Sequence, residues 1–251
     1  MSKRQWKIVG AASAAAYLSL KALARYTAER PEIDDDNPYL DGQVGAPRER
    51  GFYEQKVKPT LDGLISFVAM VALSPVYAAV AAVVYLDDPG PVLFTQKRIG
   101  KDGRFFLLHK FRSMKMSTPH DVPTHCLENP KQYITGVGRL LRRYSLDELP
   151  QFWDIFRGRL SLIGPRPALW NQYDLIAERE KYGANSVRPG LTGWAQINGR
   201  DELSIAEKAR LDGEYVRRLS FAFDCKCFFG TFGKVLRGDG VIEGKQETAK
   251  R

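Results

Sequence analysis

The strongest constraint on the fold is an apolar run in the first third of the chain. From Leu64 to Leu86 no charged residue occurs over 23 positions, and Asp62 and Asp87 stand just outside the run. A helix of this length, at about 1.5 Å per residue, is long enough to cross the hydrocarbon core of a bilayer. The alternative is a buried core helix of a soluble protein. The absence of charge over so many residues favours a membrane helix.

The pair Ser74-Pro75 lies in the middle of this run and predicts a kink. Pro75 has no backbone donor and clashes with the preceding turn, while the Ser74 hydroxyl can bond a backbone group that the kink releases. Both flanks are basic, which is typical of cytoplasmic segments. The basic residues are Lys56, Lys58, Lys97, Arg98, Lys101 and Arg104. A single crossing would export one flank, so we expect a re-entrant helix with both ends on the cytoplasmic side.

Composition divides the chain into segments. Within residues 1–30 the apolar run from Ile8 to Leu20 is short for a bilayer span, so we expect an Ala-rich helix lying on the membrane or on a partner, with a true span as the alternative. Residues 31–55, rich in Pro, Gly and charge, predict a linker. The membrane helix then takes residues 56–90 and the main domain residues 91–240, leaving a flexible tail at 241–251.

Net charge limits the class of partner. The chain has 38 basic and 29 acidic residues, a formal charge of +9, which suits nucleic acid, anionic lipid or a phosphorylated substrate. Nucleic-acid binding would leave the apolar run unexplained, and the aromatic residues are not interleaved with basic ones, so we expect no nucleic-acid partner. Three cysteines suggest a reducing compartment, and we expect Cys225 and Cys227 to be buried as small hydrophobic residues.

The fold class predicted for the main domain is mainly α with a small β-hairpin. Two apolar-rich runs around Lys101-Asp102-Gly103 indicate the hairpin, and from Tyr133 onward helical patterns alternate with loops. A polar loop between them holds potential metal ligands without regular spacing, which argues against a metal site there. These ligands are His120, Asp121, His125 and Cys126. An apolar stripe near the end is more typical of a core than of an interface, and its phenylalanines would also suit a membrane surface. It consists of Phe228, Phe229, Phe232, Val235 and Leu236.

Two adjacent acids, Asp147 and Glu148 in "YSLDELPQFW", allow two interpretations. Ser145 and Glu148 have the spacing of a capping box at a helix N-terminus. Pro150 complicates this, because a proline five residues past the N-cap removes a helical hydrogen bond. The side chain of Asp147 would take no part in such a capping box. Close to basic residues, its carboxylate would be ionised and could attack an electrophilic phosphorus.

The residues around the acidic pair favour the chemical interpretation. Arg142 and Arg143 precede it, and Arg166 stands between two prolines that fix a guanidinium able to grip a phosphate. Arg188 and Arg200 enclose a glycine-rich segment. Its glycines, which allow close backbone approach to a ligand, are Gly190, Gly193 and Gly199. Together these segments predict a diphosphate site.

The same motifs resemble a known family. In order, "KPTLD", a central "SP", "FTQKRIG", "HKFRSM", "SLDELPQFWDIFRGRLSLIGPRP" and "RPGLTGWAQINGR" are similar to the bacterial sugar transferases. These are monotopic polyprenyl-phosphate phosphoglycosyl transferases, which initiate O-antigen, capsule and protein glycosylation pathways. The resemblance covers roughly residues 56–240. It implies an enzyme docked on the cytoplasmic face of the bacterial inner membrane, with residues 91–240 as its catalytic domain.

The resemblance also implies a reaction and its partners. A phosphosugar would pass from a UDP-sugar to undecaprenyl phosphate through a covalent aspartyl intermediate, with Mg²⁺ as cofactor and release of UMP. Membrane lipid is a further expected partner, and a homo-oligomer is left open. The rival interpretation within the family is a catalytically silent membrane scaffold, for which a damaged acidic pair would be expected. Here both acids are present.

Site residues follow from the matching positions. Asp147 would be the nucleophile and Glu148 its partner, and both would hold the metal. The positions matched to substrate binding are Lys110, Arg142, Arg166, Arg188 and Arg200. Lys58 and Asp62 match residues at the start of the membrane segment, and Ser74-Pro75 matches the helix break. Asp212 and Asp224 also occupy positions where family acids occur.

Overall fold

The computed structural model describes residues 49–119, 130–199 and 202–237. Several sequence-based predictions lie outside these residues. They are the helix at 1–30, most of the linker at 31–55, the tail at 241–251, the His120–Cys126 group and Arg200.

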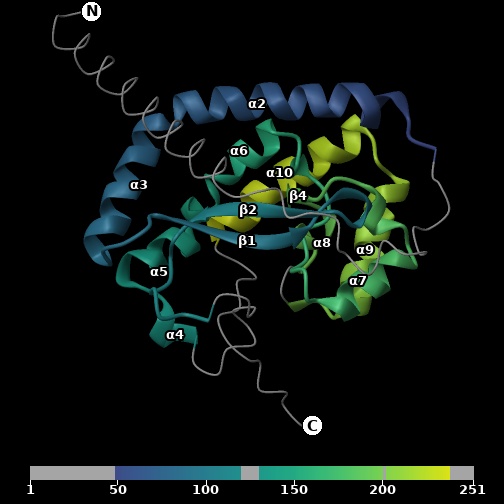
Figure 1. Ribbon diagram of the computed structural model, residues 1–251. Helices are drawn as coiled ribbons and strands as arrows, with labels where there is room; N and C mark the ends of the chain where they lie inside the picture. Colours follow the sequence, from purple (N-terminus) through teal and green to yellow (C-terminus); the bar gives the residue numbers. More distant parts are fainter. Residues whose placement is uncertain (1–48, 120–129, 200–201, 238–251) are drawn as a thin grey trace, which may run out of the picture.

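The apolar run forms two helices that meet at an angle. A π-helical turn, η1 (Tyr53–Val57), leads into α2 (Lys58–Ala72), and α3 (Ser74–Asp87) follows. In Figure 1, α2 extends along the top of the molecule and α3 descends from one end of it. Among the described residues no single helix is long and apolar enough to cross a bilayer, whereas this bent pair passes the same test as one unit.

The predicted kink is confirmed at Ser74-Pro75. The two helices are bent by 64° at the break. Pro75 lies in the first turn of α3, where its missing N–H leaves no helical hydrogen bond unmade. The Ser74 hydroxyl donates to the carbonyl of Val71 at 2.8 Å, a backbone group at the end of α2. Proline chemistry therefore sets the position of the bend.

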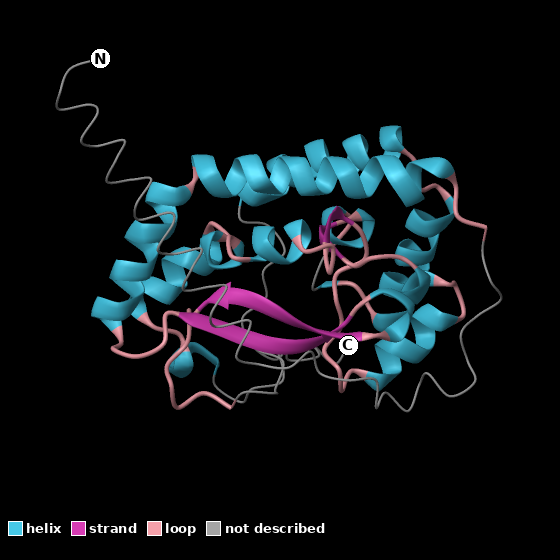
Figure 2. Cartoon of the chain, turned by 45° about the horizontal axis from the view of Figure 1, so that its top comes forward, coloured by secondary structure: helices cyan, strands magenta, loops and turns pink. Residues whose placement is uncertain are grey.

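The predicted hairpin is also confirmed. β1 (Leu93–Ile99) and β2 (Phe105–Phe111) pair antiparallel around the turn η2 (Lys101–Gly103). Asp102, at φ 54°, and Gly103, at φ 74°, adopt the left-handed conformation that such a turn needs. The helix α6 (Gln151–Phe156) lies between the hairpin and α2, which gives three layers (Figures 1 and 2).

A second, parallel sheet was not predicted. It pairs β3 (Ser161–Ile163) with β4 (Gly190–Thr192). Its glycines pack backbone against backbone: a Cβ on Gly190 would lie 2.1 Å from the Gly164 nitrogen, and one on Gly193 would lie 2.1 Å from the Gly164 oxygen. The space that Gly190 and Gly193 leave is thus filled by the chain itself, so the prediction that these two glycines make room for a ligand is wrong.

Short helices surround these sheets, and two longer ones close the C-terminal half. The short ones are α4 (Pro130–Tyr133), α5 (Gly136–Arg143), η4 (Leu146–Glu148), α7 (Tyr173–Glu180), η5 (Ala184–Ser186) and α8 (Trp194–Ile197). The longer ones are α9 (Ile205–Arg217) and α10 (Phe221–Arg237). Cys227 of α10 is fully buried beside Tyr215 and Phe223, as predicted, while Cys225 is only partly buried.

The two faces of α2 differ sharply. On the inner face Lys58 forms an ion pair with Asp224 at 2.5 Å, and Asp62 accepts a hydrogen bond from Ser161 at 2.6 Å. The buried contacts of Lys58 and Asp62 therefore hold α2 against α10 and β3. The outer face of α2 is exposed and apolar. Its residues are Leu64, Ile65, Phe67, Val68 and Val71.

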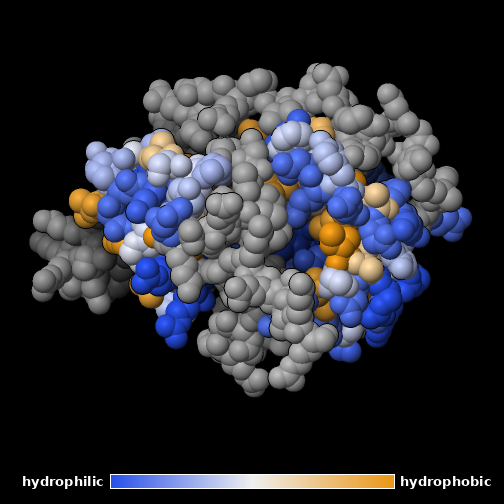
Figure 3. All heavy atoms as spheres, turned by 90° about the horizontal axis from the view of Figure 1, so that it is seen from below, coloured by the Kyte–Doolittle hydropathy of each residue, from blue (hydrophilic) through white to orange (hydrophobic). Residues whose placement is uncertain are grey.

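The opposite side of the molecule is different in character. Seen from below, the described surface is dominated by hydrophilic residues (Figure 3).

On α10, Phe228 is 40 % exposed and Phe229 is 70 % exposed, so the prediction of a core role is wrong for these two residues. The side chains of Phe232, Val235 and Leu236 lie outside the described part.

Candidate active site

The acidic pair lies on a single 3-10 turn, η4, rather than in a capping box. Ser145 precedes the turn in the left-handed conformation, at φ 55° and ψ 24°, and its side chain caps no helix. The following helix, α6, begins only at Gln151, directly after Pro150. The capping interpretation of Ser145 and Glu148 is therefore wrong, and the reason is the one that Pro150 indicated: no helix hydrogen-bond ladder can run through that position.

Glu148 joins two cations from distant parts of the chain. Its Oε1 accepts a hydrogen bond from Lys110 Nζ at 2.7 Å and another from Arg166 Nη2 at 2.6 Å. Burial opposes ionisation of Glu148, but the charges and hydrogen bonds of Arg166 and Lys110 outweigh it and hold the pKa of this carboxyl well below its usual value. Lys110 comes from β2 and Arg166 from the loop after β3, so the fold assembles the cluster from three segments.

Asp147 differs from its neighbour in having no such bonds. It is 5 % exposed, and within the described residues its side chain forms no hydrogen bond or ion pair. Burial raises the pKa of Asp147 and the Glu148 charge adds to this effect, while Lys110, Arg142 and Arg166 act in the opposite direction. The prediction that nearby arginines favour its charged form holds for Arg142, but burial has the larger effect.

Arg143, which follows Arg142 in the chain, does not belong to the group of charged side chains around Asp147. Its side chain is exposed and lies over the ring of Tyr144, with the guanidinium carbon 5.7 Å from the ring centroid. The two adjacent arginines thus point to different surroundings, as side chains about 100° apart on a helix must. Of the two, Arg142 is the one whose charge lowers the pKa of Asp147.

Arg98 is a supporting residue that sequence reasoning noted only as part of a basic flank. Its Nη1 donates to the carbonyl of Pro167 at 2.9 Å, and its Nη2 donates to Gln96 at 2.6 Å. The bond to Pro167 fixes the loop that carries Arg166. The signal in the sequence that could have indicated this role is a basic residue within the first predicted strand of the hairpin, on the face that also carries Gln96.

A buried His–Asp pair was also missed. His109 Nδ1 lies 2.7 Å from Asp154 Oδ1, and the backbone N–H of His109 donates to Asp154 Oδ2 at 2.9 Å. Both side chains are almost completely buried, at 2 % and 0 % exposed. The pair connects β2, one residue before Lys110, to α6, the helix that follows the acidic turn. It fixes the relative position of the two segments that carry Lys110 and Glu148.

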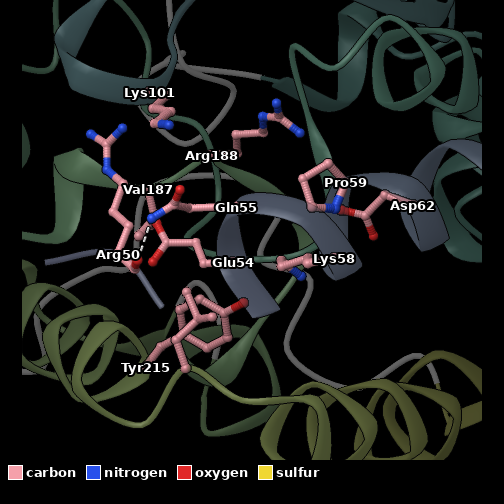
Figure 4. A pocket seen from close by; sticks show the side chains of 11 residues that line it. Arg50, Glu54, Gln55, Lys58, Pro59, Asp62, Lys101, Val187, Arg188 and Tyr215 are labelled. Atoms are coloured by element: carbon pink, nitrogen blue, oxygen red, sulfur yellow. Dashed lines mark hydrogen bonds between the residues drawn. The ribbon is translucent and has the colours of Figure 1, made fainter. Parts of the chain in front are cut away.

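Other residues predicted for the site lie elsewhere. Arg188 lines a cavity together with Lys101, near the first turn of α2 (Figure 4). Asp212 forms a buried ion pair with Arg179 at 2.6 Å. Asp224 bonds Lys58 and also accepts a hydrogen bond from Tyr215 at 2.7 Å. The cluster around the acidic pair therefore consists of Asp147, Glu148, Lys110, Arg142 and Arg166.

The composition of this cluster bears on the predicted Mg²⁺. No group of three or more His, Cys, Asp or Glu side chains suited to a metal occurs among the described residues. Mg²⁺ commonly binds proteins through one or two carboxylates and completes its shell with substrate phosphates and water. The Asp147 carboxyl, which no described side chain bonds, and the ionised Glu148 beside it fit such a partial shell.

Comparison with known proteins identifies the family. The profile described as bacterial sugar transferase matches residues 53–238, which include both helices of the bent pair, the hairpin and the acidic turn. The chain belongs to this family. The family resemblance drawn from the motifs is thereby confirmed.

Individual relatives of this bacterial sugar transferase include proteins with named reactions. The UDP-glucose:undecaprenyl-phosphate glucose-1-phosphate transferase of Escherichia coli (strain K12) is 40% identical over 191 residues, 71% of this chain and 40% of that protein. The uncharacterized sugar transferase EpsL of Bacillus subtilis (strain 168) is 38% identical over 195 residues, 78% of this chain and 95% of its own length. The chain thus spans less than half of the first relative and nearly all of the second.

A third relative has a different kind of name. The exopolysaccharide production protein ExoY of Sinorhizobium fredii (strain NBRC 101917 / NGR234) is 33% identical over 216 residues, 80% of this chain and 94% of its own length. The matches to EpsL and ExoY therefore cover nearly the whole length of both relatives.

Proposed function

We propose that this protein is a phosphoglycosyl transferase that moves a phosphosugar from a UDP-sugar to undecaprenyl phosphate. The printed name of the Escherichia coli relative describes this reaction for glucose, and the name of an Aeromonas hydrophila relative describes it for N-acetylgalactosamine. The observation that carries the proposal is the acidic turn: a buried Asp147, whose side chain forms no bond to any described residue, stands beside a Glu148 that is paired with Lys110 and Arg166.

In the first step an Asp147 carboxylate oxygen attacks the phosphorus next to the sugar. The bond from this phosphorus to the bridging oxygen breaks, and UMP leaves with the electron pair. An acyl phosphate between Asp147 and the phosphosugar remains. Lys110, Arg142 and Arg166 supply positive charge around Asp147, where negative charge accumulates on the phosphoryl oxygens.

In the second step an oxygen of undecaprenyl phosphate attacks the same phosphorus. The bond to Asp147 breaks, the carboxylate is restored, and the product is an undecaprenyl diphosphosugar. Asp147 is suited to both steps because no side chain competes for its oxygens within the described residues. A Mg²⁺ ion held by Asp147 and Glu148 would neutralise part of the diphosphate charge. The charged pairing of Glu148 keeps it ionised and therefore able to act as a ligand.

The acceptor is a lipid, so the proposal includes docking on the cytoplasmic face of the inner membrane. The exposed apolar face of α2 continues on α3, where Val76, Val83, Tyr85 and Leu86 are exposed. Contiguous apolar surface of this extent is typical of a membrane or partner contact. A re-entrant helix would insert the bent pair from one side of the bilayer and leave the acidic turn in water, within reach of the UDP-sugar.

The test is formation of the covalent intermediate. Enzyme given UDP-sugar without acceptor should gain the mass of one phosphosugar, and peptide mapping should locate it on Asp147. Asp147→Asn keeps the size of the side chain but has no anionic oxygen, so both the adduct and turnover should disappear. Glu148→Gln should slow the reaction and still form some adduct. Turnover by the Asp147→Asn enzyme, or a need for both substrates before UMP leaves, would refute the covalent mechanism.

A further inference from the structure

A second cluster of cations lies away from the acidic turn. It lines a cavity of about 530 Å³ whose walls come from η1, the first turn of α2, the hairpin turn and the segment before β4. The cationic residues are Arg50, Lys58, Lys101 and Arg188. In Figure 4 the guanidinium groups of Arg50 and Arg188 and the ammonium group of Lys101 lie in the upper part of the view, and the side chains of Gln55 and Glu54 lie below them. A cavity of this size is in the range of small-molecule sites.

Two of the four cations already have partners. Arg50 forms a forked pair with Asp102, at 2.8 Å and 3.1 Å, and Lys58 is paired with Asp224. Lys101 and Arg188 are different: within the described residues neither side chain forms a hydrogen bond or an ion pair. The cavity therefore contains two cationic groups with unused donors.

Of the acidic groups nearby, Asp102 is paired with Arg50, Glu54 lines the cavity, and Asp62 is bonded to other residues. Asp62 accepts hydrogen bonds from the Ser161 hydroxyl and the Leu162 backbone N–H. Burial lowers the pKa of Lys101, and the charges of Arg50 and Arg188 lower it further, against the opposing effects of Asp102 and Glu54. An ammonium group surrounded in this way gains stability when an anion binds beside it.

We propose that this cavity is a second phosphate site, in which Lys101 and Arg188 bind the phosphate group of a ligand. A guanidinium offers a fork of donors and an ammonium offers a point charge, a combination that suits the several oxygens of a phosphate. The site is separate from the acidic turn, because the hairpin turn and Lys110 are roughly 20 Å apart along β2 at about 3.3 Å per residue.

The phosphate could come from a lipid headgroup or from a soluble molecule. The cavity adjoins the first turn of α2, whose outer face is apolar, so a lipid phosphate at the membrane–water boundary would reach it if α2 docks as proposed above. The soluble source does not depend on that docking. Two measurements distinguish the sources.

The first measurement uses native mass spectrometry of the full-length protein released from nanodiscs containing phosphatidylglycerol and phosphatidylcholine. The second uses equilibrium dialysis of the protein in detergent with radiolabelled pyrophosphate. In either measurement Lys101→Gln/Arg188→Gln should weaken binding by about tenfold for each cation removed. The charge-preserving Lys101→Arg/Arg188→Lys protein should retain binding. Arg104→Gln/Arg139→Gln removes two exposed cations outside the cavity and is the matched control.

If the Gln double variant loses binding of phosphatidylglycerol but not of pyrophosphate, the ligand is a lipid phosphate. If it loses binding of pyrophosphate, the ligand is a soluble phosphate. Equal binding by the Gln double variant and the Arg104/Arg139 control in both measurements would refute the second site. Pyrophosphate bound at the acidic turn is recognised with Lys110→Gln/Arg166→Gln, which leaves the cavity intact. The second phosphate site and the proposed transferase reaction can be tested separately, because Asp147→Asn should abolish turnover without changing phosphate binding in the cavity.

Discussion

At the scale of single residues, the two arginines before the acidic turn have different surroundings. Arg142 lowers the pKa of Asp147, whereas Arg143 is exposed and lies over Tyr144. Burial raises the pKa of Asp147, so the carboxylate ionises at higher pH than an ordinary aspartate and needs its cationic neighbours. The adjacent arginines, Arg142 and Arg143, therefore allow a matched experiment on the charge of the proposed nucleophile.

Arg142→Gln should shift the pH dependence of adduct formation. Removing a cation that favours the anion raises the pKa of Asp147 further, so the rate should start to rise only at higher pH. Arg143→Gln removes the same charge one residue away and should leave the profile unchanged. The measurement is the rate of phosphosugar adduct formation against pH for the three proteins. Identical profiles for both variants would contradict the assigned role of Arg142.

The His109–Asp154 pair should contribute to stability because both groups are buried. His109→Leu removes the imidazole that bonds Asp154 and keeps the backbone N–H of residue 109, and loss of a hydrogen-bond partner of a buried polar group costs about 1–3 kcal/mol. His109→Leu/Asp154→Leu removes both polar groups and should recover much of that loss. Denaturant unfolding measures these differences. Lys181→Gln, which breaks an exposed pair with Glu178, is the control and should have no measurable effect. Equal stability of wild type and His109→Leu would show that the pair contributes little.

At the scale of elements, the break between α2 and α3 is the feature on which the proposed membrane topology depends. The bend of 64° lies at Pro75, and the Ser74 hydroxyl donates a hydrogen bond to the Val71 carbonyl at the end of α2. Ser74→Ala/Pro75→Leu would allow one continuous helix, because both replacements restore an ordinary helical backbone.

Cysteine labelling in intact spheroplasts tests this topology. In a background with the native cysteines replaced by alanine, cysteines at positions 56 and 104 should both be inaccessible to an impermeant reagent applied outside. The two positions lie on opposite sides of the bent pair, and both are exposed in the fold. In the Ser74→Ala/Pro75→Leu protein one of them should become accessible. Labelling of only one position in the unmodified bent pair would show a full crossing.

At the scale of the whole molecule, one side is apolar and the other hydrophilic. The bent pair presents exposed Leu, Ile, Val and Phe side chains, and the described surface seen from below is mostly hydrophilic (Figure 3). α6 and the hairpin lie beneath α2, so the acidic turn is held close to the apolar side by a continuous packed stack. This arrangement suits an enzyme whose acceptor is a lipid and whose donor is soluble.

Ile65→Glu/Val68→Glu tests the apolar side. These side chains are 47 % and 63 % exposed, so the substitutions should leave the fold intact while a charge opposes insertion into lipid. Liposome flotation should show clear loss of membrane binding. Met116→Glu, at a residue 59 % exposed beyond the hairpin, is the matched control and should float like the wild type. Unchanged flotation of the α2 double variant would argue against docking through this face.

The sequence by itself determined the features that depend on local chemistry. A proline in a helix bends it wherever the chain folds, a turn of Lys101-Asp102-Gly103 reverses the backbone with residues that accept positive φ, and Pro150 prevents a helix from starting at Ser145. The order of motifs identified the family for the same reason, since each motif is a contiguous stretch. These properties require no knowledge of what lies across the fold.

The tertiary structure decided which side chains meet. Lys110 and Arg166 are 38 and 18 residues from Glu148 in the chain, and the packing of β2 and the loop after β3 brings both to the same carboxylate oxygen. The same packing turned Lys58 and Asp62 inward and put Arg188 into a cavity with Lys101. Residue type and spacing define what a side chain can bond, but only the contacts between distant segments determine what it does bond, because burial and long-range charge are properties of the packed chain.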